Sequence, residues 1–128
     1  MKIRRYNKFT DEEELMKMIE NEEGWDYANE SNSEKYKKAL EGSITFVAHE
    51  KNKLCGFSRS IVDPGFYVYV CDLLVRQNER GLGVGRKLMA CLCDEYPDHI
   101  VYVMSDVDRY YEKLNYKREG SIFEVQKN

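Results

Sequence analysis

The chain has 128 residues, of which 42% are hydrophobic and 34% are charged, and its formal net charge at pH 7 is −3. A chain of this length buries roughly two thirds of its unfolded surface around one core, so residues 1–128 are predicted to form a single domain. Ten tyrosines and five phenylalanines argue against a disordered segment. The small negative charge gives no general electrostatic reason to bind nucleic acid, and no nucleic-acid partner is expected.

The apolar runs are only a few residues long, which predicts neither a membrane span nor a membrane partner. The N-terminus is basic but lacks the apolar stretch of a secretory signal, so a cytoplasmic, reducing location is expected and the four cysteines are predicted to be free thiols. The pair Cys91 and Cys93 has the spacing of neither a redox motif nor a zinc half-site, and the two histidines lie far from it. No metal site is predicted.

The first third of the chain favours one strand and two helices. Lys2–Tyr6 has strand character, and the pair Thr10 and Glu13 has the Thr-x-x-Glu spacing of a capping box, which predicts a helix from Thr10 that stops near Gly24. A second helix is expected over Ser33–Leu40, because its apolar residues recur at helical spacing.

A three-stranded meander is expected next. The period changes at residue 43 to the alternation of a sheet, over Ile44–Glu50, Leu54–Val62 and Phe66–Val75. Polar residues separate the first two strands, and Asp63-Pro64-Gly65 is a turn signal between the second and third.

The last third predicts two more helices and two strands. A helix begins near Val84 and ends before Pro97, and a strand covers Ile100–Met104. A short helix over Val107–Leu114 and a final strand over Lys117–Val125 close the chain. The order β-α-α-β-β-β-α-β-α-β predicts an α+β fold whose mostly antiparallel sheet contains one parallel crossover.

The loop before the third long helix contains three alternating glycines, Gly81, Gly83 and Gly85. Backbone amides of such a loop, together with the unpaired first amides of the helix, form an anion site at the positive end of the helix dipole. A phosphate-binding Walker loop needs Lys-Ser/Thr after the last glycine, and a dinucleotide fingerprint needs a glycine where Arg86 stands. The alternative is a turn that merely joins strand to helix.

The pattern Arg80-x-x-Gly83-x-Gly85 resembles the Arg/Gln-x-x-Gly-x-Gly/Ala signature of the GNAT superfamily of N-acetyltransferases. The strand end at residues 72–75 resembles the fourth strand of that family, and Tyr110–Tyr116 resembles its late Phe-Tyr-Glu-Lys-Leu-Gly-Phe segment. The order of elements agrees as well. The chain differs in having Asn115 in place of glycine, Tyr in place of the final Phe, and no evident Asn after the fifth strand.

The resemblance implies acetyl-CoA as co-substrate and no metal. Similar proteins rest the pyrophosphate on loop amides and pair the pantetheine arm with the end of the fourth strand, where the fourth and fifth strands splay apart. The residues that match these positions are Leu73, Leu74 and Val75 of the strand, Arg80 as a residue that shapes the loop, and Gly81, Leu82, Gly83, Val84, Gly85 and Arg86 of the loop and helix start.

Two residues are predicted to be catalytic. Tyr111 stands where similar proteins often place the tyrosine that protonates the leaving thiolate, although it also has the spacing of a core residue. Asp72 falls in the apolar alternation from Phe66 to Leu74, where an unpaired carboxylate would be costly. It is expected either to act as the base or to pair with Arg59, and a kink in the strand is a further way to turn it outward. Cys71 is interpreted as a small core residue, since no histidine accompanies it.

The acceptor side is less specified. Six glutamates lie between residues 12 and 23, and Trp25, Asp26 and Tyr27 follow them. These residues form either an acidic, aromatic lid for a cationic amine or a solvated helix face with Trp25 covering the core. The predicted function is transfer of acetyl from acetyl-CoA to a small-molecule or peptide primary amine by direct attack. The alternatives are a non-catalytic acyl-CoA-binding module and a small nucleotide-binding domain, and a homodimer through the final strand is left open.

Overall fold

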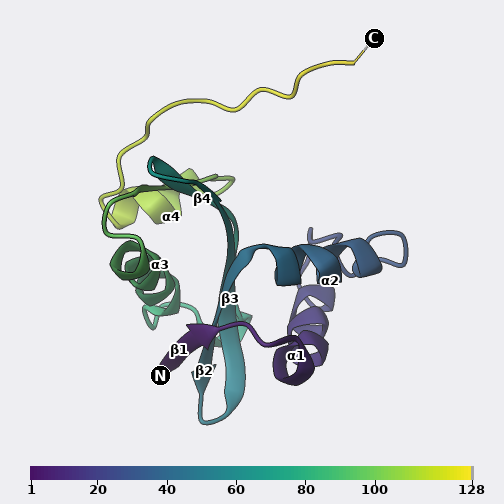
Figure 1. The fold of residues 1–128 in the computed structure, drawn as a ribbon. Helices are drawn as coiled ribbons and strands as arrows, with labels where there is room; N and C mark the ends of the chain where they lie inside the picture. Colours follow the sequence, from purple (N-terminus) through teal and green to yellow (C-terminus); the bar gives the residue numbers. More distant parts are fainter. Residues whose placement is uncertain (128) are drawn as a thin grey trace.

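The computed structural model describes residues 1–127 and is built on a five-stranded sheet (Figure 1). The strands lie in the spatial order β1-β2-β3-β4-β5, and only β4 and β5 are parallel neighbours. This confirms the mixed sheet with one parallel crossover. The bounds are β1 Lys2–Arg5, β2 Ile44–Glu50, β3 Lys53–Asp63, β4 Tyr67–Val75 and β5 Ile100–Val103.

Helices cover both faces of the sheet: α1 and α2 lie on one side and α3 on the other (Figure 1). Within residues 1–127, no helix has the length and apolar character needed to cross a membrane. The bounds are α1 Lys8–Glu20, α2 Ser33–Gly42, the 3-10 turn η1 Gln77–Glu79, α3 Val84–Glu95 and α4 Asp108–Lys113.

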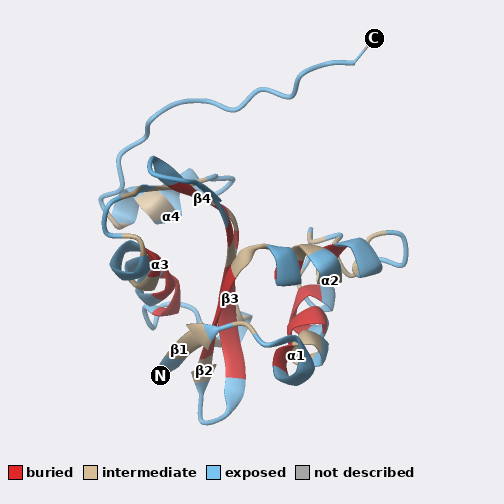
Figure 2. Cartoon of the chain, viewed as in Figure 1, coloured by how far each residue is buried: buried red, intermediate tan, exposed pale blue. Residues whose placement is uncertain are grey.

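The sheet separates two hydrophobic clusters. Leu15 and Ile19 of α1 and Leu40 of α2 pack on Phe57 of β3. On the other face, Leu88 and Leu92 of α3 pack with valines and other apolar residues from β2, β3 and β4. The buried residues follow the middle of the sheet and the inner sides of α1 and α3 (Figure 2). Burial of apolar surface on both faces therefore holds the central strands in place.

The turn between β2 and β3 is a tight hairpin. Lys51 and Asn52 both have positive φ, at 51° and 65°. A two-residue loop with both residues in this region has the twist that matches paired antiparallel strands. The polar turn expected here is confirmed.

The start of α1 differs from the prediction. The helix begins at Lys8, and its N-cap is Asn7, whose side-chain oxygen accepts a hydrogen bond from the amide of Phe9 at 2.9 Å. The reciprocal contact is made by Asp11, which accepts from the amide of Asn7 at 2.7 Å. Thr10 lies inside the first turn, so the capping box predicted for it was wrong: Asn7 occupies the cap three residues earlier.

The predicted final strand over Lys117–Val125 was also wrong. The segment from residue 117 to residue 127 has no strand or helix, and it runs outward from the end of α4 (Figure 1). Its apolar side chains are exposed, with Phe123 and Val125 both at 86%. Alternation gives a segment the propensity for a strand, but a strand forms only by pairing, and no neighbouring strand pairs with this segment within residues 1–127.

Candidate active site

A β-bulge at Cys71 shapes the centre of the site. Arg59 of β3 lies opposite Asp72, but Ser60 lies opposite Val70, so Cys71 is the extra residue of β4. Val70 packs in the α3 cluster, whereas Leu74 packs in the α1 and α2 cluster. The single apolar alternation expected from Phe66 to Leu74 was therefore wrong, because the inserted residue exchanges the faces and turns Asp72 toward α2.

The same bulge marks the point where β4 and β5 separate. Their parallel register covers Tyr67–Val70, and the last backbone bond between them runs from the Met104 amide to the Val70 carbonyl at 3.3 Å. Beyond it, residues 72–75 stay paired with β3. Leu73–Val75 therefore have an open side at the splay, which is the position predicted for an extended ligand.

The glycine loop has the backbone expected of an anion site. Gly81 and Gly83 have φ of 83° and 82°, a region that side-chain-bearing residues rarely adopt. Gly83 is the N-cap of α3 and supplies no side-chain bond to its first amides. Arg86 and Lys87 are exposed in the first turn. Unpaired amides, the helix dipole and two cations at one helix end favour an anionic ligand, and the residues fit a pyrophosphate.

Arg80 ties the loop to the rest of the molecule. Its Nε donates to the carbonyl of Val75 at 3.0 Å, and its Nη2 lies 2.6 Å from Oε1 of Glu22 in the segment after α1. One side chain thus connects the end of β4, the loop and the segment that leads to α2. This geometry supports the predicted role of Arg80 in shaping the loop.

Gly85 is required by close packing, whereas Gly81 and Gly83 are required by their positive φ. It is buried in α3, and a Cβ at this position would overlap the hydroxyl of Tyr110 and come within 3.7 Å of Leu73. The close approach brings α4 against the first turn of α3. Tyr110 therefore lies beside the predicted cofactor loop. The sequence motif pointed to Tyr111 and did not predict this position of Tyr110.

Tyr111 lies within a group of three tyrosines on and just after α4. Its ring is 5.0 Å from that of Tyr110 and is stacked with that of Tyr116 at 6.0 Å between centroids. Burial, with smaller contributions from Tyr110, Asp106 and Tyr116, raises the pKa of Tyr111 to about 12. The phenol therefore keeps its proton at neutral pH, as a general acid must.

Asp72 forms a buried network on the α2 side of the sheet. Its Oδ2 accepts from Nε of Arg59 at 2.7 Å and from the hydroxyl of Tyr36 at 2.8 Å. Arg59 also donates to the Ser43 hydroxyl at 3.2 Å, and its guanidinium lies 5.3 Å from the Tyr36 ring centre. Burial lowers the pKa of Arg59, but the hydrogen bond and charge of Asp72 outweigh it, so the net direction is upward. The predicted Arg59 pairing is present.

Tyr36 is a residue of this network that was not predicted as a site residue. It is 3% exposed, and burial together with the Asp72 charge raises its pKa. The available signal was its position on the apolar face of a helix, since a buried tyrosine hydroxyl needs a partner. Asp72 supplies that partner, from 36 residues away in the sequence.

A pocket of about 390 Å³ opens above this network. Tyr27 is stacked on Tyr36 at 4.2 Å between ring centres, and burial followed by the charge of Asp72 raises the pKa of Tyr27. Trp25 packs edge-on against Phe57 in the α1 and α2 cluster. Tyr27 therefore lines a pocket, as the lid alternative predicted, whereas Trp25 covers the core, as the other alternative predicted. The lining residues are Asp26, Tyr27, Asn32, Lys35, Tyr36, Ala39 and Arg59.

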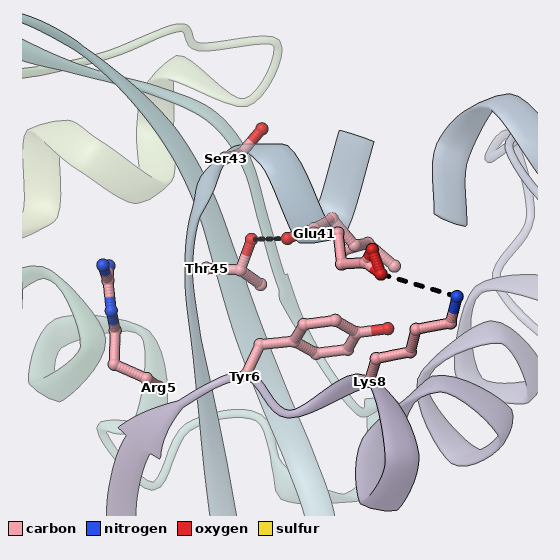
Figure 3. Close-up of a pocket in the computed structure, with 7 residues that line it drawn as sticks. Arg5, Tyr6, Lys8, Glu41, Ser43 and Thr45 are labelled. Atoms are coloured by element: carbon pink, nitrogen blue, oxygen red, sulfur yellow. Dashed lines mark hydrogen bonds and ion pairs between the residues drawn. The ribbon is translucent and has the colours of Figure 1, made fainter. Parts of the chain in front are cut away.

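A second, smaller pocket of about 170 Å³ lies between the start of α1 and the end of α2 (Figure 3). Lys8 and Glu41 pair across its mouth at 3.4 Å, and Thr45 donates to the Leu40 carbonyl at 2.8 Å. The Tyr6 side chain points into it, and burial, then the charges of nearby carboxylates, raise the pKa of Tyr6 to about 12. This pocket contains none of the predicted site residues.

The chain matches the sequence profile of the Acetyltransferase (GNAT) family over residues 8–116. It belongs to that family, which is a family of acyltransferases that use acyl-CoA. No curated protein sequence matches the chain at a significant level.

Solved structures share the fold. A ribosomal-protein-alanine N-acetyltransferase from Brucella melitensis biovar Abortus 2308 is 16% identical, with 100% of this chain and 99% of that chain covered and a TM-score of 0.76. An aminoglycoside acetyltransferase from an uncultured soil metagenomic sample, in complex with sisomicin, is 24% identical, with 99% and 96% covered and a TM-score of 0.73. An integron cassette protein from V. cholerae is 19% identical, with 99% and 93% covered and a TM-score of 0.73. At these identities the likeness shows the fold alone.

Proposed function

We propose that this protein transfers an acetyl group from acetyl-CoA to a primary amine of a small molecule or peptide, by direct attack in a ternary complex. The proposal rests on one observation: the open side of β4 continues without a break into the glycine loop. The β4 bulge opens one side of Leu73–Val75, and the same strand leads into the glycine loop and the uncapped start of α3. An extended thioester with a pyrophosphate at one end fits this path.

The loop from Arg80 to Arg86 binds the anionic end. Amides of Gly81, Leu82, Gly83, Val84, Gly85 and Arg86 face the phosphates, and Arg80 holds the loop in shape through Val75 and Glu22. The open side of Leu73–Val75 pairs with the pantetheine arm as a strand would. A backbone amide at that strand end polarises the thioester carbonyl and stabilises the oxyanion that forms there.

The acceptor occupies the pocket between α2 and β3. The amine nitrogen attacks the thioester carbon, and the C–S bond breaks when the tetrahedral intermediate collapses. Tyr111 donates its proton to the departing thiolate and is protonated again from water. The hydrogen bonds from Tyr36 and Arg59 both engage Oδ2 of Asp72. Oδ1 therefore takes the proton of the amine if Asp72 is the base, and water takes it if Asp72 only positions Arg59 and Tyr36.

The proposal is tested by thiol-release kinetics with acetyl-CoA across polyamines, aminoglycosides, amino acids and peptide N-termini. We expect release with one of these classes and a fall in kcat of about a hundredfold or more for Tyr111→Phe. Tyr116→Phe is the matched control, because it removes a neighbouring hydroxyl and keeps the stacked ring. Acetyl-CoA binding without release for any amine would refute transfer, and equal rates for the two variants would refute the role of Tyr111.

A further inference from the structure

The acceptor pocket of about 390 Å³ has one wall on α2 and another on β3. The residues of the helix wall lie three or four positions apart, so they share one side of the helix. They are the N-cap Asn32 together with Lys35, Tyr36 and Ala39. Arg59 lines the pocket from β3. Because a water molecule takes up about 30 Å³ in the liquid, the pocket has room for roughly a dozen non-hydrogen atoms, which is the size of an amino acid.

Lys35 and Arg59 are the cationic side chains among the residues that line this pocket. Lys35 is exposed, and no acidic side chain pairs with it within residues 1–127. By contrast, Lys37 of the same helix pairs with Glu34 at 3.3 Å. The ammonium of Lys35 is therefore available to an anionic group of a ligand.

Within residues 1–127, one donor of the Arg59 guanidinium has no hydrogen-bond partner. Nε donates to Asp72 at 2.7 Å and Nη1 donates to the Ser43 hydroxyl at 3.2 Å. The side chain lines the pocket and is 15% exposed, so Nη2 is the donor left to a bound molecule. A guanidinium that is already held by two partners binds a carboxylate with little further loss of rotamer freedom.

Two carboxylates balance these cations. Asp26 is an exposed residue of the lining, and Asp72 lies below it in direct contact with Arg59. The site therefore has no net charge, and opposite charges lie side by side at Arg59 and Asp72. A polyamine or an aminoglycoside would place further cations against Lys35 and Arg59, whereas a ligand with one amine and one carboxylate matches the arrangement.

We propose that the acceptor is a free α-amino acid, whose carboxylate lies between Nη2 of Arg59 and the ammonium of Lys35 and whose amine lies beside Asp72. This inference rests on the proposed function, because it names the acceptor of the same transfer. One carbon separates the amine from the carboxylate in such a molecule, so the two groups reach the adjacent Arg59 and Asp72 together. A peptide N-terminus carries no carboxylate at that spacing.

The product of the transfer is an N-acetyl amino acid. The amine nitrogen forms a bond to the acetyl carbon, and the C–S bond breaks. The nitrogen loses one proton to Asp72 or to water, and the thiolate of coenzyme A takes a proton from Tyr111. Lys35 holds the carboxylate and does not contact the reacting atoms, so it is a specificity residue.

Thiol-release kinetics across the common L-amino acids is the first test. The preferred amino acid is then compared with two analogues that lack its carboxylate, the decarboxylated amine and the carboxamide. We expect kcat/KM to be about a hundredfold or more higher for the amino acid than for either analogue. An equal or higher kcat/KM for an amine without a carboxylate, spermidine included, would overturn the inference and leave acetyl transfer standing.

Variants of α2 test the contact assigned to Lys35. The measured quantity is the ratio of kcat/KM for the amino acid to kcat/KM for its decarboxylated amine, and comparing this ratio between variants cancels the different basicity of the two amines. Lys35→Gln should lower the ratio about tenfold, mainly through KM, and Lys35→Arg should restore it. Lys38→Gln is the matched control, because Lys38 is exposed on the same helix outside the pocket. An unchanged ratio in Lys35→Gln would contradict the contact.

Calorimetry separates this inference from the proposed transfer. If no thiol is released, the same amino acids and their decarboxylated amines are titrated into the protein with coenzyme A present. An amino acid that binds at least about tenfold more tightly than its amine, and less tightly to Lys35→Gln, would support the acceptor site while refuting transfer. Equal binding of the two compounds, or binding of neither, would overturn the inference.

Discussion

The ion pair between Arg59 and Asp72 gives the sharpest prediction, because it separates the two roles considered for Asp72. Asp72→Asn removes the charge and keeps the shape of the side chain. The side chains are 15% and 5% exposed, so the substitution leaves a guanidinium buried without its anion. It also weakens the hydrogen bond from Tyr36, whose hydroxyl lies 2.8 Å from Asp72.

The expected loss is large for a single substitution. Removing one partner of a buried pair costs about 3–5 kcal/mol, and the asparagine oxygen recovers part of this by accepting one neutral hydrogen bond worth about 1 kcal/mol. We therefore expect the free energy of unfolding to fall by about 3 kcal/mol. Asp98→Asn, at an exposed position, should change it by less than about 0.5 kcal/mol.

Urea unfolding at neutral pH measures both variants. Arg59→Met and the double variant Arg59→Met/Asp72→Asn complete the cycle, and the double variant should recover most of the stability because no buried charge is left unpaired. Additive losses, or a loss below about 1 kcal/mol for Asp72→Asn, would refute the reasoning from the buried pair.

The catalytic role is read from the pH dependence of kcat/KM for Asp72→Asn, at a temperature where the variant is folded. If Asp72 is the base, its removal should abolish the acidic limb. If it only positions Arg59 and Tyr36, the rate falls while the limb keeps its midpoint. An unchanged acidic limb therefore removes Asp72 from the list of candidate bases.

Three further substitutions test the loop and the α1 cap. Gly83→Ala should cost about 1–2 kcal/mol at its positive φ and weaken acyl-CoA binding in calorimetry, and unchanged affinity would contradict the assigned anion site. Gly85→Ala should lower the thermal unfolding temperature, because the added Cβ meets the Tyr110 hydroxyl. The loss should vanish in a Tyr110→Phe background, where only the better helix propensity of alanine remains. A loss that persists in that background would refute the contact. Burial raises the pKa of Asp11, but its hydrogen bonds from Arg4 and from the Asn7 amide outweigh burial, so the net direction is downward from 3.8. The ionised carboxylate therefore stabilises the folded protein above pH 3.8, and this stabilisation is lost as the pH falls. Asp11→Asn should therefore be less stable than the parent in urea at neutral pH and equal to it near pH 2, and a constant difference at both pH values would contradict the linkage.

The sequence alone determined the order of elements as far as α4, the mixed sheet and the position of the glycine loop. These features depend on local patterns: alternation in the strands, helical spacing in α3, and glycines at a strand-to-helix junction. The family also follows from the sequence, because its motif residues lie close together along the chain. Tyr111 was found in the same way, through its neighbours in the motif, and its catalytic role stays a prediction.

Only the tertiary structure decided which groups meet. The bulge at Cys71 exchanged the faces of β4, because one inserted residue reverses an alternation of period two, and so brought Asp72 to Arg59 and Tyr36. The contact of Arg80 with Glu22 likewise joins residues distant in sequence. Residues 117–127 illustrate the same limit: their alternation predicts a strand, but whether a strand forms depends on a partner edge that local sequence does not specify.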